Sequence, residues 1–547
     1  MKCSKPSTIA LAMSILAVAA ALVACGGSVD DDDDEDPDPV DVGDTVVLTA
    51  SGKLMSFDRA SPGTVVSSVT LSGLAAGERL IGIDHRPADD KLYGIGSDGN
   101  VYTIRVGTGA ATREVALRAA SGDDNAFTAL EGSNFGVDFN PVADRLRVVS
   151  DSGQNLRINV DNGDTFTDGT ITAQTGSAAV SAAAYTNAFA GTTATQLFVI
   201  DGASATLHLQ DPPNNGTLGA GRSLGVAAGT VSGFDIDARN NRGYAVLGAG
   251  GASTLYSIDL STGTASSVGA VAGGEAIVAL ALRQPDSPRA IALTADNQLV
   301  AFDPKEPNIV TRTTTISGLA SGETVIGVDF RPADRKLYAL TSAGRLYKVD
   351  PDNGTTIVGP LLAADRADAS APYAGLVGTA FSVDFNPVAD RLRVISDTGQ
   401  NLRINVETGR TVTDGDINRS DVLPIVIAAA YTNSFGSATA TALLDVDAAS
   451  DVLAQQNPPN DGTLANIGTL GIDVAGTAGF DIAGGGNGLV LAALRADGAF
   501  TGPFTLYTVS LTTGAASLYR NTSSDASLSV IGGANGPTNL IDLAIRY

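Results

Sequence analysis

Short apolar runs alternate with polar turns along most of the chain. The stretch from Ile81, IGIDHRPADDKLYGIGSDGNVYTIRVGTG, reads as an apolar strand, an Asp, an Arg-Pro turn, and two Leu-Tyr or Val-Tyr strands separated by glycine turns. The stretch from Val325, VIGVDFRPADRKLYALTSAGRLYKVDPDNG, repeats this order. Alternation with a period of two predicts strands with one buried face, and we find no amphipathic stretch with the 3.6-residue period of a helix. The pattern therefore predicts an all-β protein.

The template recurs through the whole chain, with most copies 47 to 55 residues apart. The position that ends the first strand of each unit is Asp84, Asp138, Tyr185, Asp235, Leu282, Asp329, Asp384, Tyr431, Asp481 or Ile545. Four short strands at a period near 50 are typical of a propeller blade, because each blade is one antiparallel sheet. The ten units therefore predict a β-propeller architecture.

The two ends of the repeat region predict how the array closes. Thr45 to Asp58 matches the second and third strands of a unit without a first strand, and Leu540 to Tyr547 is a first strand with nothing after it. We expect this last strand to pair near Val46 or Ala290, because an unpaired edge invites aggregation. Propellers usually have four to eight blades, so we predict two tandem five-bladed propellers, over residues 45–288 and 289–547. A single ten-bladed ring is the alternative.

One segment is almost identical in the two halves. DFNPVADRLRVVSDSGQNLRINV (Asp138 to Val160) returns 246 residues later as DFNPVADRLRVISDTGQNLRINV (Asp384 to Val406). With AAAYTN and PPNNGTL, it resembles the bacterial family of domain of unknown function 4394, present here twice. The resemblance supports the repeat unit and implies no chemistry.

This duplicated segment carries the candidate site residues. Arginines stand where sister units have tyrosines: we assign Arg147 and Arg157 to the places of Tyr93 and Tyr102, and Arg393 and Arg403 to those of Tyr338 and Tyr347. Two planar guanidinium groups on neighbouring strands could bind a carboxylate, sulfate or uronic sugar. Our preferred interpretation is a buried network between blades, paired with Asp138 (Asp384 in the second half), Asp144 or Asp151 and stacked on tyrosines.

The chain begins with an export signal. MKCSKPSTIALAMSILAVAAALVACGG has a basic start, an apolar run and a small-residue exit. Leu22-Val23-Ala24-Cys25 resembles the lipobox of bacterial lipoproteins, which implies cleavage after residue 24 and a lipid on Cys25. We therefore predict a signal peptide over residues 1–24, an acidic tether over 25–44, and a bacterial lipoprotein attached to the membrane by its lipid. Gly26, in place of Asp, favours the outer membrane by the same resemblance.

Composition narrows the chemistry. The net charge is −25, which repels nucleic acid. Only His85 and His208 occur, and Phe330 and Ala454 replace them in the second half, so we expect no catalytic triad, no metal site and no cofactor. Calcium is the alternative cofactor, because Asp350–Gly354 and Asp445–Asp451 match a calcium loop in part.

These features favour a non-catalytic binding or scaffold protein for an extracytoplasmic glycan or protein. A propeller-type hydrolase or lactonase that depends on carboxylates or calcium is the alternative, because paired acids can carry such chemistry. An opening that collects three or more convergent acids would favour the enzyme.

Overall fold

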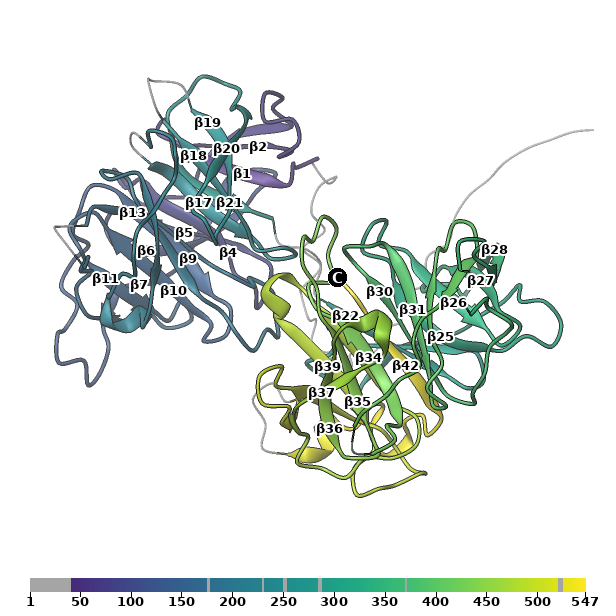
Figure 1. Cartoon of the computed structure of the whole chain (residues 1–547). Helices are drawn as coiled ribbons and strands as arrows, with labels where there is room; N and C mark the ends of the chain where they lie inside the picture. The colour runs from purple at the N-terminus through teal and green to yellow at the C-terminus, as the bar shows by residue number, and fades with distance from the viewer. Residues whose placement is uncertain are drawn as a thin grey trace, which may run out of the picture. The chain divides into compact units, whose positions relative to one another are not determined.

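The computed structural model describes residues 41–547 except 175–177, 229–230, 249–252, 284–287, 369–370, 421 and 520–524. No α-helix occurs among the described residues, and strands joined by turns form ten sheets (Figure 1). The all-β prediction is therefore confirmed. The signal segment, the tether and Cys25 lie outside the described residues, and within those residues no helix is long and apolar enough to cross a membrane.

The first half contains five sheets. Their orders are β21-β1-β2-β3, β4-β5-β6-β7, β9-β10-β11-β12-β8, β13-β14-β15-β16 and β17-β18-β19-β20. The strands are β1 (Thr45–Thr49), β2 (Lys53–Phe57), β3 (Ser67–Thr70), β4 (Leu80–His85), β5 (Leu92–Gly96), β6 (Asn100–Arg105), β7 (Ala110–Ala116), β8 (Arg118–Ala119), β9 (Phe135–Asn140), β10 (Arg145–Ser150), β11 (Asn155–Ile158), β12 (Asp164–Thr167), β13 (Val180–Tyr185), β14 (Leu197–Asp201), β15 (Thr206–Gln210), β16 (Arg222–Ser223), β17 (Val231–Asp237), β18 (Arg242–Leu247), β19 (Thr254–Ile258), β20 (Ala265–Ala270) and β21 (Ile277–Leu282).

The second half repeats this plan. Its sheets are β42-β22-β23-β24, β25-β26-β27-β28, β30-β31-β32-β33-β29, β34-β35-β36-β37 and β38-β39-β40-β41. The strands are β22 (Arg289–Thr294), β23 (Gln298–Phe302), β24 (Val310–Thr315), β25 (Val325–Phe330), β26 (Leu337–Thr341), β27 (Arg345–Val349), β28 (Thr356–Leu361), β29 (Ala363–Ala364), β30 (Phe381–Asn386), β31 (Arg391–Ser396), β32 (Asn401–Ile404), β33 (Arg410–Thr413), β34 (Val426–Tyr431), β35 (Leu443–Asp447), β36 (Val452–Gln456), β37 (Leu464–Thr469), β38 (Gly479–Ala483), β39 (Leu489–Leu494), β40 (Thr505–Val509), β41 (Ala516–Leu518) and β42 (Leu540–Arg546). Short 3₁₀ turns cover Pro213–Asn215, Pro459–Asp461, Gly485–Asn487, Ala526–Ser529 and Gly533–Asn535.

In each half, the last strand pairs with a strand from the beginning of the same half. In the first half β21 pairs antiparallel with β1, with Ala281 opposite Val46. In the second half β42 pairs antiparallel with β22, with Ile545 opposite Ala290. Of the two partners expected for the last strand, Ala290 is confirmed and Val46 is wrong, because β21 already occupies that edge.

The first strands of the five sheets in a half contact one another in cyclic order. In the first half the order is β21, β4, β9, β13, β17 and back to β21, and in the second it is β42, β25, β30, β34, β38 and back to β42. Figure 1 shows β4, β9, β17 and β21 side by side. These strands are mostly buried, and small residues predominate in β13, whose sequence is VSAAAY.

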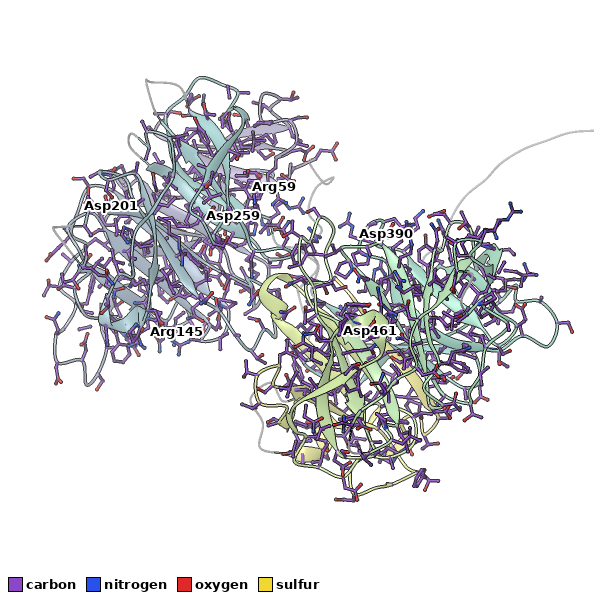
Figure 2. The ribbon with its side chains drawn as sticks, viewed as in Figure 1. Arg59, Arg145, Asp201, Asp259, Asp390 and Asp461 are labelled. Atoms are coloured by element: carbon purple, nitrogen blue, oxygen red, sulfur yellow. The ribbon has the colours of Figure 1, made fainter. Side chains whose placement is uncertain are left out.

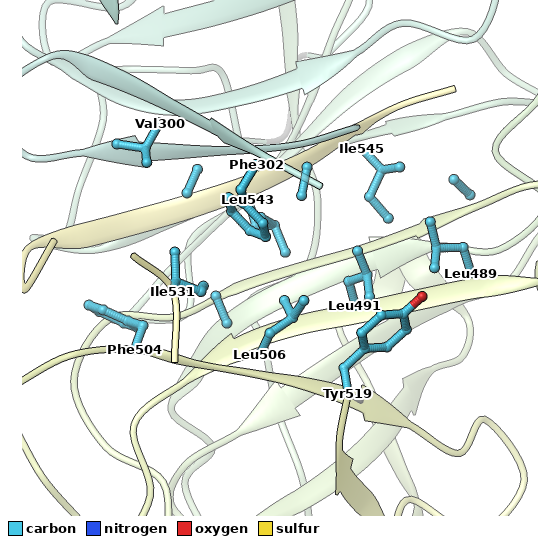
Figure 3. Close-up of a cluster of buried hydrophobic side chains, with 14 of the residues drawn as sticks. Val300, Phe302, Leu489, Leu491, Phe504, Leu506, Tyr519, Ile531, Leu543 and Ile545 are labelled. Carbon is cyan, nitrogen blue, oxygen red and sulfur yellow. The ribbon is translucent and has the colours of Figure 1, made fainter. Parts of the chain in front are cut away.

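Apolar cores lie between neighbouring sheets. Figure 3 shows the core between the last and the first sheet of the second half, where Leu489 and Leu491 of β39 face Phe302 of β23 and Leu543 of β42. Each such side chain is at most 2% exposed, and burying one contributes roughly 1.5–3 kcal/mol. The contact between these sheets joins the end of the second half to its beginning.

Candidate functional site

Arg147 of β10 lies between its own sheet and the next one, and its side chain is 1% exposed. Its Nε donates to the Tyr185 hydroxyl at 3.2 Å, its Nη1 to the Asp168 carboxylate at 2.7 Å, and its Nη2 to Asn214 at 2.7 Å. Nη1 also donates to Asn155 at 2.8 Å. The N–H groups of this guanidinium therefore donate to groups inside the protein.

Arg157 of β11 stands directly opposite Arg147 in the sheet register. The carboxylate of Asp168 lies between these like charges, because Arg157 donates to its two oxygens at 2.8 and 3.0 Å. The guanidinium of Arg157 also lies over the Phe166 ring, 4.9 Å from its centroid. About one third of the Arg157 side chain stays exposed.

The second half repeats the arrangement. Arg393 is 2% exposed and donates to Tyr431, Asn401, Asp414 and Asn460, the last at 3.0 Å. Arg403 lies opposite Arg393 and donates to both oxygens of Asp414, at 2.6 and 2.9 Å. One carboxylate again accepts hydrogen bonds from two arginines.

The structure corrects three details of the sequence interpretation. The acid that pairs with these arginines is Asp168 or Asp414, and not Asp138, Asp144, Asp151 or Asp384. The arginines contact tyrosines through a hydroxyl group, while the ring under Arg157 is Phe166. The register also puts Arg157 in the place of Thr103, because Thr103 lies opposite Tyr93 as Arg157 lies opposite Arg147. Leu156 takes the place of Tyr102.

The acids named from the sequence serve other contacts. Asp144, at the turn before β10, accepts Arg86 of the preceding sheet at 2.8 and 2.5 Å, and Asp390 accepts Arg331 in the same way (Figure 2 labels Asp390). Asp151 accepts backbone N–H groups of the loop before β9. The duplicated segment thus binds the sheet before it through Asp144 and the sheet after it through Arg147 and Asn155, whose amide donates to the Pro213 carbonyl at 3.0 Å.

A second set of acids meets where the first strands converge. Asp84, Asp138 and Asp235 bring one carboxylate oxygen each to within 4.8 Å of one another, and Asp329, Asp384 and Asp481 do the same in the second half. All six are buried. We call these two groups the carboxylate triads.

Each triad acid also ties its strand to the neighbouring first strand. Asp84 accepts the Phe139 N–H at 2.7 Å, Asp138 accepts the Tyr185 N–H at 2.9 Å, and Asp235 accepts the Leu282 N–H at 2.7 Å. Equivalent bonds run from the second triad to the N–H groups of Phe385, Tyr431 and Ile545. The triads therefore connect neighbouring first strands through hydrogen bonds.

Burial makes ionisation of these acids unfavourable. It raises the pKa of Asp235 and of Asp481 to about 7, against the backbone N–H bonds that lower it. In Asp84 and Asp138 burial and then the neighbouring triad charge raise the pKa well above the usual range, and the same holds for Asp329 and Asp384. Each triad can hold protons, or a cation that balances its charge.

The sequence placed these acids at equivalent positions of repeated units but did not predict that they meet. The signal was present, since three of the five units in each half have Asp at the same position of the first strand. Asp168 and Asp414 lie in TDG turns beyond the nearly identical segments that end at Val160 and Val406, and the TDG motif shared by the two halves was the signal for them.

The remaining candidates lie apart from the triads and the arginines. His85 is buried and its ring nitrogens have no hydrogen-bond partner among the described residues, whereas His208 bonds Thr206 and the Gly219 carbonyl. Asp350 accepts the Asp352 N–H at 2.9 Å within its turn. Asp445 lies in β35, fully buried, rather than in a loop.

Together the folded sheets define a tandem-repeat all-β protein whose repeated polar residues join neighbouring sheets. The chain belongs to the family described as Domain of unknown function (DUF4394), whose model matches residues 53–281 and again 298–532. A comparison with curated proteins gives no match. Among solved structures, the chain is similar to one titled "Structure of U3-55K", at 13% identity and a TM-score of 0.26, over 59% of this chain and 89% of the other.

Proposed function

We propose that the protein is a pair of five-bladed propellers that acts as a non-catalytic binding or scaffold module for an extracytoplasmic glycan or protein. The pairings of β1 with β21 and of β22 with β42 support two rings over the single ten-bladed alternative, because each half uses its own last strand to complete its own first sheet. The propeller then presents its turns as the surface for a partner.

One observation supports the non-catalytic role: the repeated charged residues are hydrogen-bonded to other groups of the protein. Arg147 and Arg393 are buried and bonded to four partners each, and each triad acid binds a backbone N–H group. Residues of this kind position sheets, and a substrate would have to displace their partners at a large cost in desolvation.

Turnover assays test this role. We expect the purified chain to hydrolyse none of a broad panel of glycosides, lactones and esters, and to bind components of the cell envelope saturably. Turnover that is abolished by a single Asp or Glu substitution would overturn the proposal.

A calcium-dependent hydrolase or lactonase is the second candidate, and the carboxylate triads favour it. Three convergent acids are the arrangement that this alternative requires, and carboxylate oxygens are the ligands that Ca²⁺ prefers. Under this candidate, calcium raises the thermal midpoint of the wild-type chain, and the double variant Asp138→Asn and Asp384→Asn loses both that rise and the turnover. A midpoint that calcium does not move removes this candidate.

We further propose that the protein is exported and attached to the outer membrane by a lipid on Cys25. The lipobox-like residues 22–25 support this, and the acids between Asp30 and Asp44 suit a spacer, because like charges repel one another. In the bacterial host, Cys25→Ser should move the protein from the membrane fraction to the soluble fraction. A Cys25→Ser protein that stays with the membrane would contradict the lipid anchor.

A further inference from the structure

The two halves differ in charge at one end of their first sheets. Arg289, just before Ala290, occupies the position of Asp44, because Ala290 lies opposite Ile545 as Thr45 lies opposite Leu282. Arg335, in the turn after β25, occupies the position of Asp90. Two acids of the first half are therefore arginines in the second.

The turn that holds Arg335 has kept its geometry despite this change. Arg335 has a φ of 55° and Asp90 a φ of 57°. A left-handed conformation is common for Asp and uncommon for Arg. The arginine therefore persists at a position where local backbone preference favours the acid of the other half.

A like-charge pair lies next to this turn. Arg289 stands directly opposite Arg546 in the β22–β42 register, and like charges in that position destabilise a sheet. Neither arginine has a close acidic partner of its own. Arg289 lies 3.6 Å from the Asp303 carboxylate. Arg546 pairs with Asp352, which also pairs with Arg312 at 2.7 Å. About half of each of these three arginine side chains is exposed.

These cations face one cavity. Its second-half side includes Arg289, Arg312, Arg335, Lys336 and Arg546, and residues of the first half, Asp90, Asp237 and Arg239 among them, line its other side. Arg335 and Lys336 are exposed, and neither side chain makes a hydrogen bond or ion pair with the described residues. A cationic wall in a chain of net charge −25 concentrates anions locally.

Triad acids line the same cavity. Asp329 and Asp481 line it, with Asp384 and Asp542 packed close behind them. Burial raises the pKa of Asp481 to about 7, so this acid opposes an anion less as the pH falls. Asp90, Asp237, Asp334 and Asp352 also line the cavity, and the cations must outweigh them. Phe330 and Ile545 add apolar surface.

We propose that the second-half side of this cavity, which has Arg289 and Arg335 where the first half has Asp44 and Asp90, binds a ligand through a carboxylate or phosphate group. The inference rests on the proposed binding function and names its ligand class. Guanidinium groups bind planar or tetrahedral oxyanions through paired, charge-assisted hydrogen bonds, and Arg289, Arg335 and Lys336 supply donors that the fold does not use fully.

Calorimetric titration of the full chain with three probes tests the inference. D-galacturonate carries a carboxylate, D-galactose is its uncharged match, and inorganic phosphate is the anion without a sugar. We expect galacturonate and phosphate to bind at pH 6, more weakly at pH 8 and in high salt, and galactose not to bind. Binding of galacturonate without phosphate would assign a carboxylate ligand, and binding of phosphate without galacturonate would assign a phosphate ester.

The double variant Arg289→Asp and Arg335→Asp restores the charges of the first half, which folds with Asp at both positions. We expect it to lower the affinity for the anions about tenfold or more. The control Arg79→Asp and Arg113→Asp makes the same charge change at exposed residues of the first half and should leave the affinity unchanged.

Galactose binding as tightly as galacturonate, equal loss in both variants, or no binding of any anion would overturn the inference. In those cases the proposed binding function survives if envelope components still bind without turnover. Hydrolysis of the panel substrates would instead overturn the proposed function and leave anion binding to be judged by the titration alone.

Discussion

At the scale of single residues, one carboxylate in each half decides whether two arginines can be buried together. Asp168 is 8% exposed and Asp414 5%, and each lies between a fully buried arginine and a partly exposed one. Without the acid, the buried guanidinium would keep its charge, because arginine cannot lose its proton in a protein. The contribution of the network to the stability of the fold therefore depends mainly on the acid.

We expect Asp168→Ala to destabilise the first half by about 3 to 5 kcal/mol, because it leaves Arg147 charged and buried without a counterion. Hydrogen exchange at increasing urea, followed on first-half peptides, measures the change. Arg157→Ala is the matched control: it removes the partly exposed partner and leaves the buried pair, so its loss should be much smaller. Equal losses in the two variants would show that the buried pair carries no special weight.

The carboxylate triads predict how stability depends on pH. Because the pKa of Asp235 is about 7 in the folded chain and near 3.8 when unfolded, the folded state binds the extra proton between these values. Stability from this group is therefore highest at pH 4 and is lost as the pH rises toward 7, by a few kcal/mol. Urea unfolding at pH 5 and pH 8 measures the difference.

Asp235→Asn should reduce that pH dependence, because the amide oxygen still accepts the Leu282 N–H but no longer titrates, while the other triad acids keep their raised pKa values. Asp259→Asn, at an exposed turn where the pKa is lowered by hydrogen bonds to Ser261, is the control and should keep the pH 5 to 8 difference of the wild type. A wild-type chain that is equally stable at the two pH values would contradict raised pKa values in the triads.

At the scale of elements, neighbouring first strands approach one another so closely at some glycines that a side chain would not fit there. A Cβ atom on Gly136 would lie 2.5 Å from the Ala183 nitrogen, and one on Gly233 would lie 2.4 Å from the Leu280 nitrogen. Gly479, the equivalent of Gly233 in the second half, is crowded to 2.4 Å by Leu543. The tight contact of the first strands is therefore built into the sequence of both halves.

Gly233→Ala should cost more than about 2 kcal/mol, because the new methyl group meets backbone atoms that cannot move aside and the φ of +146° disfavours alanine. Gly63→Ala is the control, since its Cβ would lie 3.8 Å from the nearest atom, the Ala270 carbonyl, and it should change stability by about 0.5 kcal/mol or less. Thermal unfolding compares the two variants. A Gly233→Ala chain as stable as the control would contradict the close approach.

The strands themselves were predictable from the sequence, and the partners of the polar residues were not. Alternation and turn residues gave the repeat, the ends of the first strands and the strand that completes the last sheet, because these depend on local preference and on edges that must be paired. Asp168 lies beyond the nearly identical segment that ends at Val160. It reaches Arg147 only after two hairpin turns, so no local sequence pattern predicts the pair. The meeting of Asp84 with Asp138 and Asp235 likewise depends on how the sheets are arranged around one another.

At the scale of the whole molecule, the closing strands define where the chain can be divided. Thr45 to Leu282 includes both β1 and the strand β21 that pairs with it, and Arg289 to Tyr547 includes both β22 and β42. A boundary within residues 284–287 would therefore leave every sheet complete. A boundary before β21 would strip the first sheet of one strand and expose the edge of β1, and unpaired edges promote aggregation.

We therefore expect residues 41–285 and 286–547, produced separately, to be monomeric and to unfold cooperatively with the β-type circular dichroism of the full chain. Residues 41–274, which end before Ile277, are the matched control and should aggregate or stay unfolded, because Val46 and Leu48 lose the strand that covers them. Size-exclusion chromatography and urea unfolding separate these outcomes. A single ten-bladed ring predicts that both long fragments aggregate or stay unfolded. Division of such a ring would leave an unpaired edge at each end of each fragment.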